Sequence, residues 1–203
     1  MHIRPATRAD SADIAILDDI ASSGLASHVL ETGVREGRYD RSLECGRDGI
    51  AYSDGPYSWV NALIAEIDGD VAGMSLSFEL AGTEPDADAD ADVSGPVLEP
   101  IEKLKSRALG TRFIDSVGVY NRFRGRGAGK ALVEAEIARA EPHACSIITD
   151  DANGRALELY RGLGFIEQAH APYVPFSQNR SAGRWVLLIR PAASQAGASI
   201  SAH

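Results

Sequence analysis

The sequence predicts a mixed α/β domain, and three patterns along the chain carry this prediction. Two strand-forming runs joined by a two-residue turn predict an antiparallel hairpin in the first half. Strand and helix patterns then alternate through the second half, where a glycine-rich turn connects one strand to the helix that follows it. A hairpin followed by alternating strands and helices is typical of one sheet flanked by helices.

Size and composition set the expected domain organisation. The 203 residues suit a single domain with a substantial core, and the hydrophobic share of 44% argues against a wholly disordered chain. We expect this domain over residues 1–191, with an acidic mobile loop over 81–96 and a flexible tail over 192–203. The loop prediction rests on five acidic side chains between Glu84 and Asp92, a stretch with too little apolar surface to offset its ordering entropy.

Charge and residue usage exclude several classes of function. The formal net charge of -9 disfavours a nucleic-acid binder and favours a cationic small molecule or peptide as partner. Neither a secretory pattern nor an apolar run near the roughly 20 residues that cross a bilayer is present, so we expect no membrane partner. Cys45 and Cys145 lack metal or redox spacing, which indicates reduced thiols in a cytoplasmic protein. His28, His143 and His170 show no metal-ligand spacing either, and we expect no metal.

Local patterns predict the elements of the first half. They are a strand at His2–Pro5, a helix from Ser11 after a Thr7 cap, a helix at Ser27–Gly37, a loop to Pro56, and hairpin strands Ser58–Ile67 and Val71–Leu80 around an Asp68-Gly69 turn. Thr7 and Asp10, three residues further on, form a capping pattern. Gly33, Gly37 and Gly46 weaken the helical pattern, which is why we expect a loop after the second helix.

The second half is predicted to alternate between helices and strands. The elements are a helix at Leu98–Leu109, a strand at Arg112–Tyr120, a helix at Lys130–Ala140, a strand at Ala144–Thr149, a helix at Gly154–Leu163, a strand from Phe165 and a strand at Trp185–Arg190. Apolar residues at helical spacing mark the helices, and runs of β-branched and aromatic residues mark the strands. The glycine-rich turn follows the first of these strands.

The turn from Arg124 to Lys130 is the strongest candidate for a binding site. Between a strand and a helix, backbone N–H groups converge on an anion, and the helix dipole favours negative charge there. Glycine lets the backbone approach a phosphate closely. The motif alone is equally compatible with a tight connection that binds nothing. It is not a Walker loop, because Ala131 follows Lys130, and it lacks the βαβ context of a dinucleotide fingerprint.

Two motifs in this half resemble one known family. The spacing Arg124-x-x-Gly127-x-Gly129 is similar to the Q/R-x-x-G-x-G/A motif of the Gcn5-related N-acetyltransferases, the GNAT superfamily. The run from Asn153 to Phe165, NGRALELYRGLGF, resembles the second GNAT pattern, N-x-x-A-x-x-L-Y-x-x-x-G-F. Both motifs occur in the family's order, and the resemblance covers about residues 1–190.

This resemblance implies a fold, a cofactor and an activity. The implied fold is a single-domain GNAT fold, with a central mixed, mostly antiparallel sheet flanked by helices. The implied activity is direct transfer of acetyl from acetyl-CoA to a primary amine of a small molecule or peptide, by a monomer or homodimer. The alternative is a non-catalytic acyl-CoA-binding or sensor module. The residues implied to bind the cofactor are Val117, Gly118, Val119, Arg124, Gly125, Arg126, Gly127, Ala128, Gly129, Lys130 and Asn153.

The resemblance also implies roles for individual side chains. Tyr160 occupies the family's general-acid position, although its helical spacing also suits simple packing. Asn153 either contacts the cofactor or only caps the helix that follows. Asp115 is a candidate base or acceptor contact on the strand before the turn, and Glu66 and Glu79 compete with it for the role of base.

Overall fold

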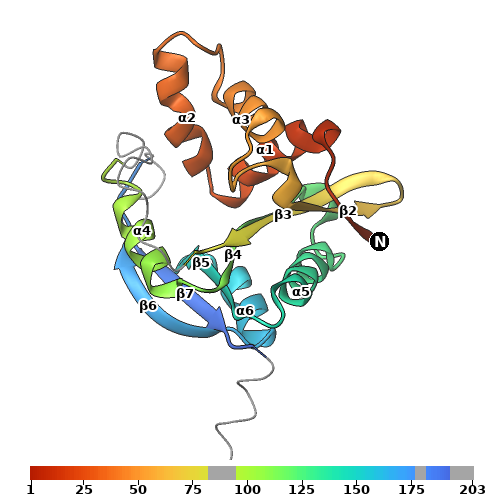
Figure 1. Cartoon of the computed structure of the whole chain (residues 1–203), viewed down its shortest axis with the longest axis vertical. Coiled ribbons are helices and arrows are strands. Elements are labelled where there is room, and N and C mark those ends of the chain that lie inside the picture. Colours follow the sequence, from red (N-terminus) through yellow and green to blue (C-terminus); the bar gives the residue numbers. More distant parts are fainter. Residues whose placement is uncertain (82–94, 177–181, 193–203) are drawn as a thin grey trace, which may run out of the picture. The chain divides into compact units, whose positions relative to one another are not determined.

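The structure is a computed structural model that describes residues 1–81, 95–176 and 182–192 (Figure 1). Most of the predicted acidic loop and of the predicted tail lies outside these residues. The described residues form two compact units. The first comprises Met1–Phe78 and Asp115–Glu136, and the second comprises the described residues within Glu79–Ile114 and Ile137–His203. No helix in the described ranges is both long enough and apolar enough to cross a membrane.

Seven strands form one sheet in the order β1-β2-β3-β4-β5-β7-β6. The strands are β1 His2–Pro5, β2 Ala62–Ile67, β3 Asp70–Glu79, β4 Arg112–Val119, β5 Cys145–Asp150, β6 Ile166–Pro172 and β7 Arg184–Arg190. The pairs β1–β2, β2–β3, β5–β7 and β6–β7 are antiparallel, whereas β4 and β5 run parallel. This confirms the predicted mixed, mostly antiparallel α/β fold.

The predicted hairpin is present as β2 and β3. Its turn residues Asp68 and Gly69 have φ values of 57° and 86°, the left-handed pair that a two-residue hairpin turn needs. The first strand begins at Ala62 rather than at Ser58, because Trp59–Asn61 forms a 3-10 turn. The hydrogen bond from the Asn61 N–H to the Ser58 carbonyl, at 3.0 Å, belongs to that turn.

Three helices lie in the first unit: α1 (Ser11–Ala21), α2 (Leu25–Arg35) and α3 (Ser42–Tyr52). The third corrects the prediction of a loop up to Pro56. A Cβ built on Gly46 would lie 3.2 Å from Leu30 Cδ1 and 3.5 Å from Ala15 Cβ, so this glycine lets α3 approach α2 and α1 closely. Tertiary packing thereby outweighs the cost of about 1 kcal/mol that each helical glycine carries.

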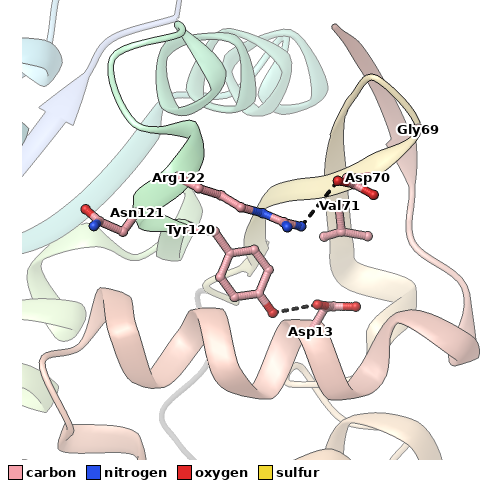
Figure 2. A pocket seen from close by; sticks show the side chains of 7 residues that line it. All are labelled: Asp13, Gly69, Asp70, Val71, Tyr120, Asn121 and Arg122. Carbon is pink, nitrogen blue, oxygen red and sulfur yellow. Dashed lines mark hydrogen bonds and ion pairs between the residues drawn. The ribbon is translucent and has the colours of Figure 1, made fainter.

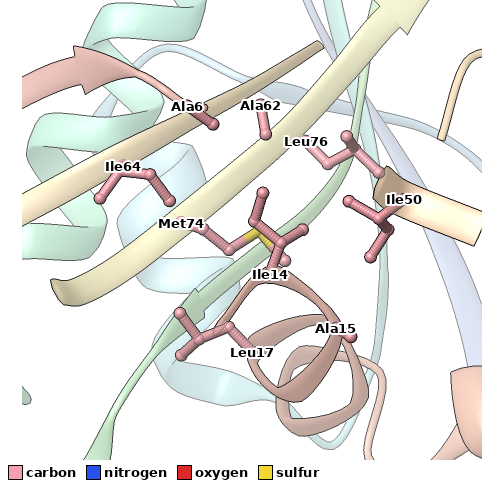
Figure 3. Packing of buried hydrophobic residues seen from close by; sticks show 9 residues of the cluster. All are labelled: Ala6, Ile14, Ala15, Leu17, Ile50, Ala62, Ile64, Met74 and Leu76. Atoms are coloured by element: carbon pink, nitrogen blue, oxygen red, sulfur yellow. The ribbon is translucent and has the colours of Figure 1, made fainter. Parts of the chain in front are cut away.

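Buried apolar side chains from these elements make up the core of the first unit (Figure 3). The cluster comprises Ala6, Ile14, Ala15, Leu17, Ile50, Ala62, Ile64, Met74 and Leu76. The members from α1 share one helix face, and those from β2 and β3 alternate along their strands and so lie on one face of the sheet. The helical and strand periodicities of the sequence therefore meet in one cluster.

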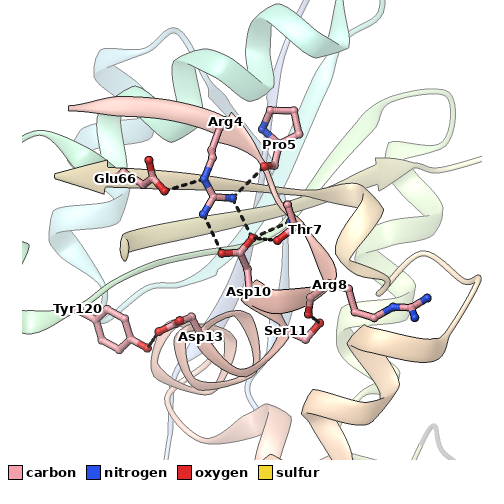
Figure 4. A network of polar contacts seen from close by, with 9 residues as sticks. All are labelled: Arg4, Pro5, Thr7, Arg8, Asp10, Ser11, Asp13, Glu66 and Tyr120. Atoms are coloured by element: carbon pink, nitrogen blue, oxygen red, sulfur yellow. Dashed lines mark hydrogen bonds and ion pairs between the residues drawn. The ribbon is translucent and has the colours of Figure 1, made fainter. Parts of the chain in front are cut away.

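A polar network ties β1 to the start of α1 (Figure 4). Arg4 donates to both carboxylate oxygens of Asp10, at 2.8 and 2.9 Å, and to Glu66 at 2.8 Å. The Thr7 N–H also donates to Asp10, at 2.7 Å. The Arg4 hydrogen bonds are the main cause that lowers the pKa of Asp10 to about 2. The predicted Thr7–Asp10 pair is thus present, although it closes the 3-10 turn Arg8–Asp10 that precedes α1.

The second unit is built around β5, β6 and β7. Its helix α4 (Glu99–Lys105) packs against β6 and β7, and α6 (Gly154–Gly162) lies between β5 and β6 in the chain. β7 contributes the continuous buried run from Trp185 to Leu188. The remaining helix, α5, spans Ala128–Ala140 and begins two residues before the predicted start at Lys130.

Candidate functional site

The glycine-rich turn leads from β4 into α5 within the first unit. Gly125 and Gly127 have φ values of 78° and 86°, in the left-handed region where other residues are strained. A Cβ built on either glycine would meet nothing within 4 Å, so the space beside the backbone is open. The first α5 hydrogen bond runs from the Ala131 N–H to the Gly127 carbonyl at 3.0 Å. Helix geometry leaves the N–H groups of residues 128–130 without an intrahelical acceptor, and these are available to an anion.

A buried aromatic ring holds this turn in place. Phe123 is buried in a cluster with apolar residues of β2, β3 and α5: Leu63, Ala65, Ile67, Ala72, Ala128 and Leu132. The half-buried side chains of Val117 and Val119 pack against the same cluster. The turn backbone is thus anchored from both sides, which pre-organises its N–H groups.

The basic side chains near the turn already have acidic partners. Arg126 lies 3.0 Å from Asp68 of the hairpin turn, and the Lys130 ammonium lies 3.7 Å from Glu134, one turn along α5. Arg124 donates instead to the Val119 carbonyl, at 3.2 Å. These ion pairs are exposed, and exposed pairs contribute little free energy, so a phosphate group is able to compete for both cations.

An open pocket of about 700 Å³ lies beside residues 120–122, which precede the turn in the chain (Figure 2). It is lined by Asp13, Gly69, Asp70, Val71, Tyr120, Asn121 and Arg122. The Tyr120 hydroxyl donates to Asp13 at 2.5 Å, and Arg122 lies 3.4 Å from Asp70. Burial, followed by the Asp13 interaction, raises the pKa of Tyr120. None of these residues was a sequence candidate, because the pocket joins α1, the hairpin and the end of β4, which are far apart in the chain.

The predicted residues of β4 take two different positions. Gly118 is buried against α1, where an added Cβ would lie 2.3 Å from the Leu17 carbonyl oxygen. Asp115 is half-buried. Its neighbour Ser116 is 7% exposed. Glu66, a competing candidate for the base, is held by Arg4 at 2.8 Å.

Asp18 of α1, which also lies in the first unit, is a candidate that the sequence did not indicate. Burial raises the pKa of Asp18, the negative charge of Asp115 raises it further, and the pKa reaches about 7. A carboxyl that titrates near neutral pH is a candidate for proton transfer. In the sequence Asp18 looks like an ordinary polar position of an amphipathic helix, and nothing there signals its burial or its neighbour on β4.

The second sequence motif folds as predicted in the second unit. The Asn153 side-chain oxygen accepts from the Ala156 N–H at 3.2 Å, so this residue caps α6. Tyr160 is 6% exposed, and its ring centroid lies 5.9 Å from that of Phe165. Burial raises the pKa of Tyr160, which keeps the phenol protonated. Among the described residues no cluster of three or more metal-ligating side chains occurs.

Comparisons with known proteins identify a family and similar folds. The family model described as the acetyltransferase (GNAT) family matches residues 29–165. A solved structure described as an acetyltransferase is 21% identical, with a TM-score of 0.63 and coverage of 95% of this chain and 100% of the other. An N-acetyltransferase from Staphylococcus aureus Mu50 is 19% identical, with a TM-score of 0.62 and coverage of 93% and 100%.

A third similar structure was solved with a ligand. The protein yncA of Salmonella typhimurium, solved with its cofactor acetyl-CoA, is 18% identical, with a TM-score of 0.56 and coverage of 94% of this chain and 93% of the other. At these identities the likeness shows the fold. A comparison with curated proteins found no match.

Proposed function

Because the chain belongs to the GNAT acetyltransferase family, we propose that it transfers the acetyl group of acetyl-CoA directly to a primary amine of a small molecule or peptide. The observation that carries the proposal is the turn before α5, with its two left-handed glycines and its unobstructed backbone. Such a turn at the N-terminus of a 13-residue helix suits a pyrophosphate.

The cofactor would be held mainly by backbone groups. The residues proposed to hold the pyrophosphate are Arg124, Gly125, Arg126, Gly127, Ala128, Gly129 and Lys130. The main chain of Val117, Gly118 and Val119 would bind the pantetheine arm. The side chains of Val117 and Val119 also pack against the Phe123 cluster. The Asn153 oxygen caps α6, which supports a positioning role for this residue.

The proposed chemistry is direct attack without an acetyl-enzyme. The amine lone pair forms the C–N bond at the thioester carbonyl, and the C–S bond breaks. The departing thiolate needs a proton, and we assign Tyr160 as its donor. Burial raises the pKa of this phenol, so the proton stays in place until a stronger base forms beside it. The assignment rests on the sequence motif together with this burial.

The nature of the acceptor is supported by charge and by the similar proteins. The net charge of -9 favours a cationic acceptor, and a primary amine is cationic at neutral pH. One similar structure is described as an N-acetyltransferase and another as a ribosomal-protein-alanine N-acetyltransferase from Brucella melitensis. Nitrogen is therefore the proposed nucleophile, in a metabolite or a peptide.

The test is calorimetric titration with acetyl-CoA, followed by an amine panel monitored for release of free thiol. Binding with amine-dependent thiol release supports the transferase. Binding without release from any small amine or peptide supports the alternative of an acyl-CoA sensor, and absence of binding contradicts the proposal. Polyamines, aminoglycosides and basic peptides belong in the panel, together with neutral amines of matched size.

A further inference from the structure

Helix α1 lies along β4 in a matched register. Asp13 of the helix accepts from Tyr120 of the strand, and Leu17, one turn later, lies against Gly118. Four helical residues rise about 6 Å and two strand residues rise about 6.6 Å, so these two contacts have matching spacing along α1 and β4. The strand residues 120, 118 and 116 alternate onto one face of β4. Ser116 on this face interacts with Asp18, the helix residue that follows Leu17.

Close backbone contact sets the position of Asp18. The distance of 2.3 Å from a Cβ built on Gly118 to the Leu17 carbonyl oxygen leaves no room for any side chain at this strand position. Leu17 itself is fully buried in the core cluster, together with residues of β2 and β3 (Figure 3). Asp18 follows Leu17 directly and is therefore placed by packing rather than by its own contacts.

The buried hydroxyl of Ser116 independently indicates a ligand site. Its side chain is 7% exposed, and its hydroxyl has no hydrogen-bond partner among the described residues. The hydroxyl is close enough to Asp18 to lower the pKa of that carboxyl, yet its geometry falls short of a hydrogen bond. A buried hydroxyl without a partner costs free energy, so the site is incomplete until a polar group joins Asp18 and Ser116.

We propose that Asp18 is the base that removes a proton from the acceptor amine, and that Ser116 is the positioning residue that orients the Asp18 carboxylate and the incoming nitrogen. The inference rests on the proposed function and assigns its missing base. An ammonium group would donate hydrogen bonds to the Asp18 carboxylate and to the Ser116 hydroxyl oxygen. A carboxyl with a pKa of about 7 accepts a proton near neutral pH better than an ordinary one does.

The acceptor ammonium gives one proton to the Asp18 carboxylate, and the nitrogen lone pair then attacks the thioester carbon. The C–N bond forms, the C–S bond breaks, and the thiolate is protonated as proposed above. The nitrogen releases its second proton to solvent, and Asp18 releases its proton to solvent at the end of the cycle. Tyr160 takes one proton back from solvent, which restores the phenol. The sum is amide, CoA and one proton from ammonium and acetyl-CoA.

The first experiment compares Asp18→Asn with Asp19→Asn. Both changes remove one negative charge from adjacent positions of α1. The Asp19 oxygen accepts from the Ser27 N–H at 2.9 Å, and an asparagine oxygen retains that bond. We expect D18N to lower kcat about 100-fold with an unchanged Kd for acetyl-CoA, and D19N to stay within about threefold of wild type. Equal kcat values for D18N and wild type would overturn the inference.

The pH dependence of kcat/KM distinguishes Asp18 from Asp115. The groups that act on the Asp18 carboxyl are Asp115 and Ser116 of β4 and Asp19 of its own helix. Ser116→Ala removes the hydroxyl that lowers the pKa, so the acid limb should move to higher pH. Asp115→Asn removes a charge that raises the pKa, so the limb should move to lower pH. Shifts of opposite sign support Asp18 as the titrating base.

Two further outcomes would overturn the assignment of Asp18 as the base. Loss of activity in D115N with no shift in S116A assigns the base to Asp115 and overturns the inference. Wild-type protein that releases no CoA with any amine contradicts the proposed function, and the inference falls with it. Calorimetric binding of acetyl-CoA to each variant shows that a loss of turnover is not a loss of folding.

Discussion

The Ser75 hydroxyl of β3 donates a 2.6 Å hydrogen bond to Glu136 of α5, a carboxylate that is completely buried. Ser77, two residues along the same strand face, donates to the other carboxylate oxygen at 2.5 Å. Hydrogen bonds to a buried charge contribute more than ordinary ones, because the charge has lost its water. This contact joins the hairpin to α5, the helix that follows the glycine-rich turn.

Removing the Ser75 hydroxyl should lower the stability of the protein. Ser75→Ala leaves one oxygen of Glu136 short of a donor, and we expect the free energy of unfolding to fall by about 1–3 kcal/mol. Urea denaturation measures the change. Ser106→Ala, at an exposed serine that bonds only a nearby carbonyl, is the matched control and should change stability by less than about 0.5 kcal/mol. Equal effects in the two variants would show that Glu136 is satisfied without Ser75.

Gly118 should tolerate no side chain. Gly118→Ala places a methyl 2.3 Å from the Leu17 carbonyl oxygen, so α1 or β4 must move, and overpacking of this kind costs about 1–3 kcal/mol. Gly49→Ala is the control, because Gly49 lies inside α3 with nothing within 4 Å of the new Cβ. G49A should raise the thermal midpoint, since alanine favours a helix, and G118A should lower it. A G118A protein as stable as wild type would contradict the described contact.

The turn glycines offer a separate test of cofactor binding. Gly127→Ala strains a backbone with φ of 86° and narrows the space beside the N–H groups, so the Kd for acetyl-CoA should rise about tenfold or more. Gly110→Ala is matched in strain, because Gly110 also has a positive φ, of 80°, and an open Cβ position, but lies before β4 and outside the turn. Both variants should lose stability, whereas only G127A should lose affinity in calorimetry. Equal affinities would argue against the turn as the pyrophosphate site.

Substitution of Tyr160 should lower turnover and leave the affinity for acetyl-CoA unchanged. Tyr160→Phe keeps the ring contact with Phe165 and removes the proposed proton donor, so kcat should fall about 100-fold at constant Kd for acetyl-CoA. Because burial raises the pKa of Tyr160 above its ordinary value of 10, wild-type kcat should not decline through ionisation of this phenol between pH 7 and about 10. Unchanged turnover in Y160F would remove Tyr160 from the mechanism.

The Arg4–Asp10 pair should make stability depend on pH at the acidic end. The folded-state pKa of Asp10 is lowered from 3.8 to about 2, so its stabilisation is complete above pH 4 and is lost as the pH falls toward 2. Asp10→Asn should therefore cost about 2 kcal/mol at pH 7, and the difference from wild type should shrink toward pH 2. Denaturation at both pH values measures it. Asp54→Asn, at an exposed acid, should show no such convergence.

Several elements follow from local sequence alone. Asp68 and Gly69 encode a left-handed turn whatever surrounds them, and the hairpin forms as predicted. The glycines at 125 and 127 likewise mark the strand-to-helix turn, because few other residues adopt its backbone. Asn153 predicts the start of α6 through its own side chain. Each of these signals acts between residues that are close in the chain.

Other features were decided by contacts between distant residues. Helix α3 forms despite its glycines because Gly46 packs against α1 and α2, a gain that local propensity does not contain. Asp18 acquires a raised pKa only when folding buries it beside Asp115 of β4. The sequence by itself determined the turn chemistry, the periodicities and the two motifs. Tertiary structure alone decided which charged groups lose their water and what they face, since burial and electrostatic coupling depend on distances in space.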